Sequence, residues 1–125
     1  YIPFITSFIN NMRKIEREMI QAIIDQRDWK KANMRVEREC LSSRVYLHDN
    51  HIATHWDNGL LFITDAGWKT NTTKSRLNSL IQFVHGGLAG LFQKKYNWHI
   101  RLPLKSGDTQ DFEWFGNPIH VESLV

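Results

Sequence analysis

Cysteine and long apolar runs are almost absent from this sequence of 125 residues. Cys40 is alone, so an internal disulfide and a metal site built from several thiolates are both excluded. No apolar stretch reaches the roughly 18 residues of a membrane-spanning helix, and the charges between Arg13 and Glu18 fall where a signal peptide is apolar. We therefore expect a cytoplasmic protein without a membrane partner.

Acidic residues are missing from one third of the chain. Residues 66–107 contain seven Lys and Arg and no Asp or Glu, whereas residues 1–65 contain nine residues of each sign. Residues 108–125 reverse the pattern with four acids and no base, so the net charge of +3 conceals a basic segment followed by an acidic one. A basic segment favours an anionic partner, and the acidic end of the same chain is an alternative source of that negative charge.

The length and a hydrophobic content of 42% predict a single domain over residues 1–125, with a helix in 1–28 and an α+β core in 29–125. From Thr6 to Asp28 the apolar residues recur three and four positions apart, which predicts one long amphipathic helix. Two interpretations of its apolar stripe remain open. The stripe packs on the rest of the domain, or it joins copies of the chain in a homo-oligomer.

Residues 33–65 change to short segments rich in β-branched and aromatic residues, which predict a meander of antiparallel strands. A second helix is expected from about Thr72 to Val84, where helical spacing returns. Two strands should follow around a turn at residues 95–97, and two more should pair through the turn at 116–118. The predicted class is α+β: a long N-terminal helix, an antiparallel meander, one internal helix and further antiparallel strands.

Several motifs occur in order along the chain: WKKANMRVE, VYLHDNHIA, GLLFITDAGWKTNTTKSRLNSLI and FQKKYNWHI. Together they resemble a small domain that many tailed bacteriophages encode and that has no assigned activity. Its pattern includes a Val-Tyr-Leu-His-x-Asn-x-Ile-Ala hairpin and a Gly-Trp-x-Thr-x-Thr-Thr-x-x-Arg-Leu-Asn helix start. The resemblance leaves out the N-terminal helix. It implies a phage protein with a small accessory role in the host-cell cytoplasm, and it supplies no mechanism.

Three positions depart from the pattern of that family. The segment from Ala32 to Met34 stands where Gly-Asn-Thr is usual, Asp49 replaces a turn glycine, and Lys74 replaces an arginine. Asp tolerates a left-handed turn, and Lys74 keeps a cation at the same helical position. The departures therefore concern local backbone geometry more than charge.

The histidines of LHDNHIATHW are candidate metal ligands. If Asp49 and Asn50 form a two-residue turn, His48 and His51 face each other across the hairpin. His55 lies on the same face as His51 but about 13 Å farther along the strand, too far to join one metal ion. Since no thiolate or placed carboxylate completes the set, we predict cross-strand packing or turn hydrogen bonding and no metal site.

Signatures of catalysis are also missing. Cys40 has no glycine-flanked elbow, and neither a Gly-x-Ser-x-Gly motif nor a phosphate-binding loop occurs. Asp65 precedes the helix-start motif as a lone carboxylate, which is typical of a turn rather than of a general base. We therefore predict that the protein is not an enzyme and requires no cofactor.

The helix start in GWKTNTTKSRLNSL carries cations where the helix dipole favours acids. One interpretation is capping alone, with Trp68 and Leu77 in the core and the cations in solvent. The other adds anion binding, because free N–H groups, hydroxyls and cations together suit a phosphate. The predicted phosphate-binding residues are Lys69, Thr70, Thr72, Thr73, Lys74 and Arg76, helped by Lys94, Lys95 and Arg101 on the later strands.

Two functions of different classes follow. The first is a non-enzymatic accessory protein that binds a nucleic acid or a nucleotide, with Asn97, His99 and Arg101 forming a polar strand face beside the helix start. The alternative is a protein-protein effector, either an inhibitor of a host protein or an assembly factor, that acts through the N-terminal helix and self-association. In either case the acids of residues 108–125 are able to cover the basic surface without any ligand.

Overall fold

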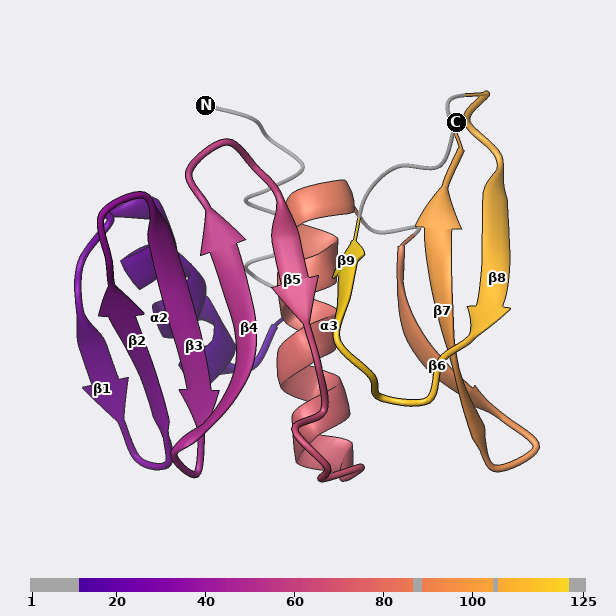
Figure 1. The fold of residues 1–125 in the computed structure, drawn as a ribbon, viewed down its shortest axis with the longest axis horizontal. Helices are drawn as coiled ribbons and strands as arrows, with labels where there is room; N and C mark the ends of the chain where they lie inside the picture. The colour runs from indigo at the N-terminus through magenta and orange to yellow at the C-terminus, as the bar shows by residue number, and fades with distance from the viewer. Residues whose placement is uncertain (1–11, 87–88, 105, 122–125) are drawn as a thin grey trace.

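The computed structural model describes residues 12–86, 89–104 and 106–121. Within them, two helices accompany nine strands in two antiparallel sheets, which confirms the α+β class (Figure 1). The helices are α2 (Lys14–Ile24) and α3 (Asn71–His85). The large sheet has the order β1 (Trp29–Lys31), β2 (Met34–Arg38), β3 (Ser42–Leu47), β4 (Asn50–Trp56), β5 (Leu61–Ile63) and β9 (Ile119–Val121). The small sheet has the order β6 (Gly90–Lys94), β7 (Asn97–Pro103) and β8 (Thr109–Glu113).

Helix α2 is shorter than the sequence predicted. It has 11 residues and begins after Arg13, whose extended backbone (ψ 151°) interrupts a helix at that point. It ends before Asp28 because Gln26 adopts a left-handed conformation (φ 54°) and β1 then pairs with β2. The expected helix from Thr6 to Asp28 is therefore wrong at its C-terminal end and in its length, while Thr6 itself lies outside the described residues.

The apolar stripe of α2 packs inside the protein. Met19, Ile20 and Ala22 are fully buried, and Ile23 is nearly so, where the helix contacts β1, β2 and α3. Ile24, at the end of the helix, remains 45% exposed. This part of the stripe belongs to the core of the subunit, as the first of the two interpretations expects.

Two hairpins of the large sheet turn through residues with left-handed backbones. The β1–β2 turn places Ala32 at φ 53°, and the β3–β4 turn places His48 and Asp49 at φ 50° and 65°. The β3–β4 turn therefore lies one residue earlier than predicted. The residue opposite His51 across the strands is Tyr46, and not His48 as predicted. Asp49 does adopt the conformation that the sequence required of it.

The last two strands belong to different sheets. Strand β8 pairs with β7, while β9 pairs with β5 in the register that places Ile63 opposite Ile119. The predicted hairpin through residues 116–118 is wrong because that segment carries the chain from one sheet to the other. Its anchor is the carbonyl of Gly116, which accepts hydrogen bonds from the Asp65 N–H and the Thr64 hydroxyl, both at 3.0 Å.

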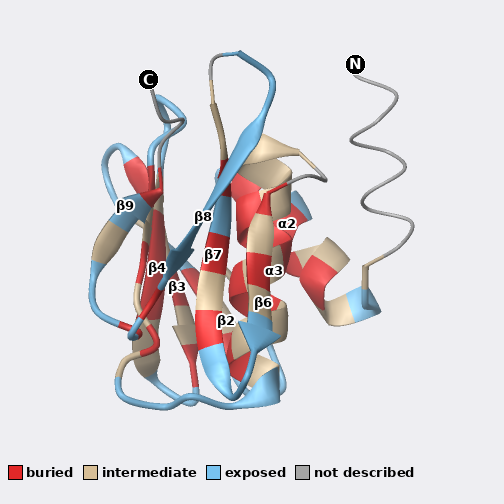
Figure 2. Ribbon diagram, turned by 90° about the vertical axis from the view of Figure 1, so that its right-hand side faces the viewer, coloured by how far each residue is buried: buried red, intermediate tan, exposed pale blue. Residues whose placement is uncertain are grey.

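Helix α3 lies at the centre of the fold. Both helices cover one face of the large sheet, and buried residues gather between the layers (Figures 1 and 2). Leu77, Leu80 and Ile81 of α3 are fully buried, and the helix contacts β4, β5 and β6. The predicted helix from about Thr72 to Val84 is thus confirmed within one residue at each end. This packing fixes where the start of α3 meets the hairpin between β3 and β4.

Candidate ligand site at the start of helix α3

Thr70 caps helix α3. Its backbone is extended, and its hydroxyl accepts a hydrogen bond from the Thr73 N–H at 3.1 Å. Its carbonyl accepts the N–H of Lys74 at 3.0 Å, which is the first bond of the helix. Asn71 and Thr72 occupy the first two positions of α3. Their N–H groups have no acceptor within the helix, so they are available to an external group. The predicted capping is confirmed, and it leaves two donors at the helix start.

A cavity of about 500 Å³ opens beside this helix start. One wall comes from the β3–β4 hairpin, and the other comes from the loop and first turn of α3. Three of the predicted phosphate-binding residues line it, and all three are threonines. The lining residues are Leu47, His48, Asn50, Ile52, Asp65, Trp68, Thr70, Thr72 and Thr73.

Asp65 is the buried charge of this cavity. Only 6% of the residue is exposed, and its Oδ1 accepts the N–H of Gly67 at 2.8 Å. Among the described residues, no group donates a hydrogen bond to its Oδ2. The hydrogen bond to the Gly67 N–H confirms the turn role predicted for Asp65. Its place in the cavity was missed because the β3–β4 hairpin that forms the opposite wall is distant in sequence.

Trp68 is the large exposed residue at this cavity. It is 62% exposed, so the interpretation that placed it in the core is wrong, although Leu77 is buried as expected. The reason is local geometry, because the left-handed Ala66 and Gly67 turn the chain outward just before it. Exposure of an indole at the edge of a cavity is typical of a surface that meets a ligand.

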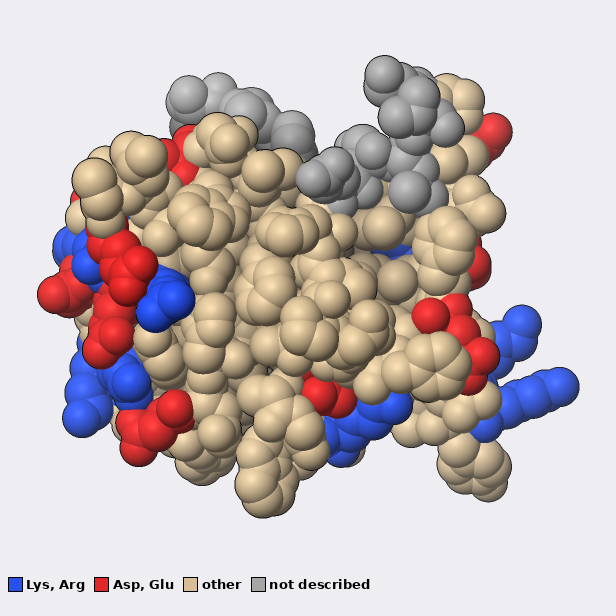
Figure 3. All heavy atoms as spheres, viewed as in Figure 1, with Lys and Arg blue, Asp and Glu red and all other residues tan. Residues whose placement is uncertain are grey.

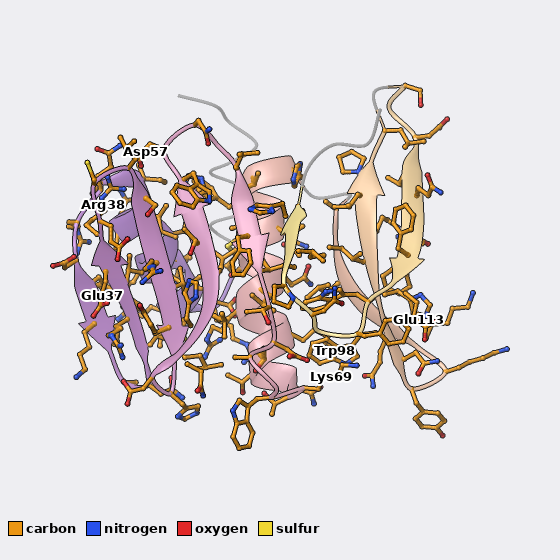
Figure 4. All side chains as sticks on the ribbon, in the orientation of Figure 1. Glu37, Arg38, Asp57, Lys69, Trp98 and Glu113 are labelled. Carbon is orange, nitrogen blue, oxygen red and sulfur yellow. The ribbon has the colours of Figure 1, made fainter. Side chains whose placement is uncertain are left out.

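The cations of the helix-start motif have different fates. The ammonium of Lys69 lies over the ring of Trp98, 5.8 Å from its centre (Figure 4). Lys74 is half-buried on the first turn. Arg76 is buried and pairs with Glu16 at 2.8 Å. The prediction that it belongs to a surface site is therefore wrong. Position 76 lies one helical turn from buried Leu80, which explains why the cation faces α2 instead of solvent.

The cations of the small sheet do not converge on the helix start. Lys94 ends β6 and Lys95 lies in the β6–β7 turn, at one end of the molecule in Figure 1. Arg101 makes two hydrogen bonds to Asp111 on β8, at 2.8 and 3.1 Å, and these bonds lower the pKa of that carboxyl. An acid of residues 108–125 therefore does neutralise a cation of the basic segment, and Figure 3 shows no broad basic patch on the face it displays.

Comparison with known proteins gives a family. The model of the family described as Kyanoviridae Gp96 protein matches residues 12–120. The chain belongs to this family. No curated protein and no solved structure matches it. The phage origin implied by the sequence motifs is therefore supported, and the match extends into α2, which the motif resemblance left out.

The three histidines that were candidate metal ligands contact other side chains of the protein. His48 bonds to the amide of Asn33 at 3.1 Å, and His51 bonds to the Thr54 hydroxyl at 2.7 Å. His55 packs on Phe83, and burial lowers its pKa below the ordinary value. In the part of the chain that the structure describes, no group of three or more His, Cys, Asp or Glu is arranged to hold a metal ion. The same part contains no helix long and apolar enough to cross a membrane.

Proposed function

We propose that this phage protein is a non-enzymatic accessory protein that binds a phosphate-bearing ligand in the cavity at the start of α3. The observation that carries the proposal is the position of three threonines of the helix start along one cavity, where the N–H of Thr72 has no acceptor within the helix. Such donors suit a phosphate, which the positive end of the helix dipole also attracts. The first turn of α3 contains no acid that would compete for them.

The distribution of cations favours a nucleotide over a long nucleic acid. Binding along a nucleic-acid backbone requires several cations on one surface. Arg76 is buried with Glu16, and Arg101 is held by Asp111. Lys69 and Lys74 each lie one position from a lining residue, and the ammonium of Lys69 lies over the ring of Trp98, 5.8 Å from its centre. These placements support a site that receives one phosphate group.

The first experiment is a titration with inorganic phosphate followed by NMR. We expect the amide signals of Asn71 and Thr72 to move most, and Thr72→Val to weaken binding because it removes a hydroxyl and keeps the side-chain shape. Thr109→Val on exposed β8 is the matched control. Unchanged amide signals at saturating phosphate would contradict the proposal. Titration of labelled DNA and RNA at two salt concentrations tests the nucleic-acid form, since binding to a backbone must weaken with salt.

The alternative proposal is a protein-protein effector that docks on a host protein or on itself through the N-terminal helix. Because Met19, Ile20 and Ile23 are used in the core, the apolar surface that remains on α2 is the exposed Ile24 and part of the half-buried Ile15. The test is the molecular mass in solution over a wide concentration range, for the natural chain and for Ile24→Glu. A monomer at every concentration would remove self-association, and an oligomer that survives Ile24→Glu would place the contact elsewhere.

A further inference from the structure

We infer that the cavity at the start of α3 selects a nucleotide, whose base lies against Trp68 and whose sugar or base donates a hydrogen bond to Asp65. This inference rests on the proposed function, which places the phosphate at the helix start. It adds two residues that no motif had assigned to binding, and it gives each of them a part of the nucleotide to contact.

Asp65 makes a bare anion a weaker ligand than an anion that also carries hydrogen-bond donors. A carboxylate that is more than nine-tenths buried in the same cavity as a phosphate would repel it. A ligand that carries hydrogen-bond donors beside its phosphate resolves this conflict, because the donors satisfy the carboxylate. One oxygen of Asp65 already accepts the Gly67 N–H at 2.8 Å, and the other lies beside Gly116 and has no hydrogen-bond donor among the described residues. A buried carboxylate with an unused acceptor suits a hydroxyl or an amine of the ligand.

Trp68 supplies the surface for an aromatic ring. The indole is 62% exposed while it lines the cavity, so one part of it is free to meet a ligand. Bases stack on exposed aromatic side chains whatever their identity, because every base has a π face. Leu47 and Ile52 add apolar lining on the β3–β4 side. The cavity therefore has an apolar part for a ring and a polar part for a phosphate and its neighbouring donors.

The size of the cavity also fits one nucleotide. Pockets for small ligands have volumes of about 300–1,000 Å³, and this cavity has about 500 Å³. A phosphate ion alone would leave most of such a volume empty. A nucleoside monophosphate combines the three features that the lining requires: an anion, hydrogen-bond donors and a flat ring.

The test is calorimetric titration of the full chain with inorganic phosphate and with AMP, GMP, CMP and UMP. We expect at least one nucleotide to bind about tenfold or more tightly than phosphate. Trp68→Ala should weaken nucleotide binding about tenfold and leave phosphate binding within about twofold, and Trp68→Phe should restore part of the loss. The matched control is Tyr96→Ala, which removes another exposed aromatic, in the β6–β7 turn.

Asp65→Asn is the second variant. The amide oxygen of Asn can still accept the Gly67 N–H, while an NH₂ group, which is a donor, replaces the second oxygen. We expect nucleotide binding to weaken about tenfold and phosphate binding to stay equal or to tighten, since a negative charge is removed. Asp108→Asn, at an exposed acid, should change neither. Because Trp68 is exposed, its variants keep the test valid if Asp65→Asn fails to fold.

The outcomes separate the two proposals. If phosphate binds but the nucleotides bind no more tightly, or if the Trp68 and folded Asp65 variants bind nucleotides like the natural chain, this inference is overturned and the phosphate site stands. If neither phosphate nor any nucleotide binds, both proposals are overturned together.

Discussion

Glu16 and Arg76, which are 60 positions apart in the sequence, form a buried ion pair with Oε2 and Nη1 2.8 Å apart. The hydroxyl of Ser75 donates to the same carboxylate oxygen at 2.5 Å. The pair connects α2 to α3 and takes a cation of the helix-start motif out of the surface. It explains why part of the basic segment serves the fold rather than a ligand.

Glu16→Gln should destabilise the protein by about 3–5 kcal/mol, because it leaves the Arg76 charge buried without its counter-charge. The control is Glu18→Gln on the same helix. Glu18 pairs with Lys31 at 2.8 Å in a largely exposed position, so its loss should change the free energy of unfolding far less than the loss of Glu16 does. Urea denaturation measures both variants. Equal losses of unfolding free energy in the two variants would show that the buried ion pair contributes no more to stability than the exposed one.

Gly116→Ala should destabilise the protein by more than about 2 kcal/mol, because two effects add. Gly116 has φ 85°, and an added Cβ would clash with Oδ2 of Asp65. Gly59→Ala separates the two effects, since Gly59 has φ 96° and nothing within 4 Å of the added atom. We expect about 1 kcal/mol for that control. Thermal unfolding of both variants is the measurement, and a smaller effect at Gly116 than at Gly59 would exclude the close contact.

Ala32→Gly should stabilise the protein by about 0.5–1 kcal/mol. Ala32 occupies a two-residue hairpin turn with φ 53°, a conformation that glycine adopts without strain. The expected gain is the released strain less the extra entropy that glycine gives the unfolded chain. Ala53→Gly, in the middle of buried β4, should instead destabilise. An unfolding temperature for Ala32→Gly below that of the natural chain would contradict this interpretation.

Lowering the pH from 7 to 5 should reduce stability, and His55 should account for part of the loss. Burial beside Phe83 lowers the pKa of His55 below its ordinary value of 6.5, so the unfolded chain binds more protons than the folded one in this window. Stability therefore falls as the pH falls. His55→Gln should make the dependence shallower. Urea denaturation at several pH values gives the slopes, and identical slopes for the natural chain and His55→Gln would refute the assignment.

Local features of the sequence predicted much of the fold. Helical spacing placed α3 within one residue at each end, and Thr70 caps it as the Thr and Asn cluster indicated. Alternation on NWHIRL put Asn97, His99 and Arg101 on the more exposed face of β7, as the structure confirms. These predictions succeeded because capping, turn and strand preferences depend on neighbours within a few positions. The length of α2 failed because one extended residue interrupts an apolar pattern that continues on both sides.

Tertiary structure decided the relationships between distant segments. The sequence determined which residues are apolar, which turns need left-handed backbones and where basic and acidic residues concentrate. It did not determine that Arg76 faces Glu16, that Arg101 is held by Asp111, or that β9 leaves β8 to pair with β5. It also did not determine that Asp65 and Trp68 share a cavity with the threonines of α3. Each of these depends on which buried faces pack together, and that choice is made by the whole core rather than by any local pattern.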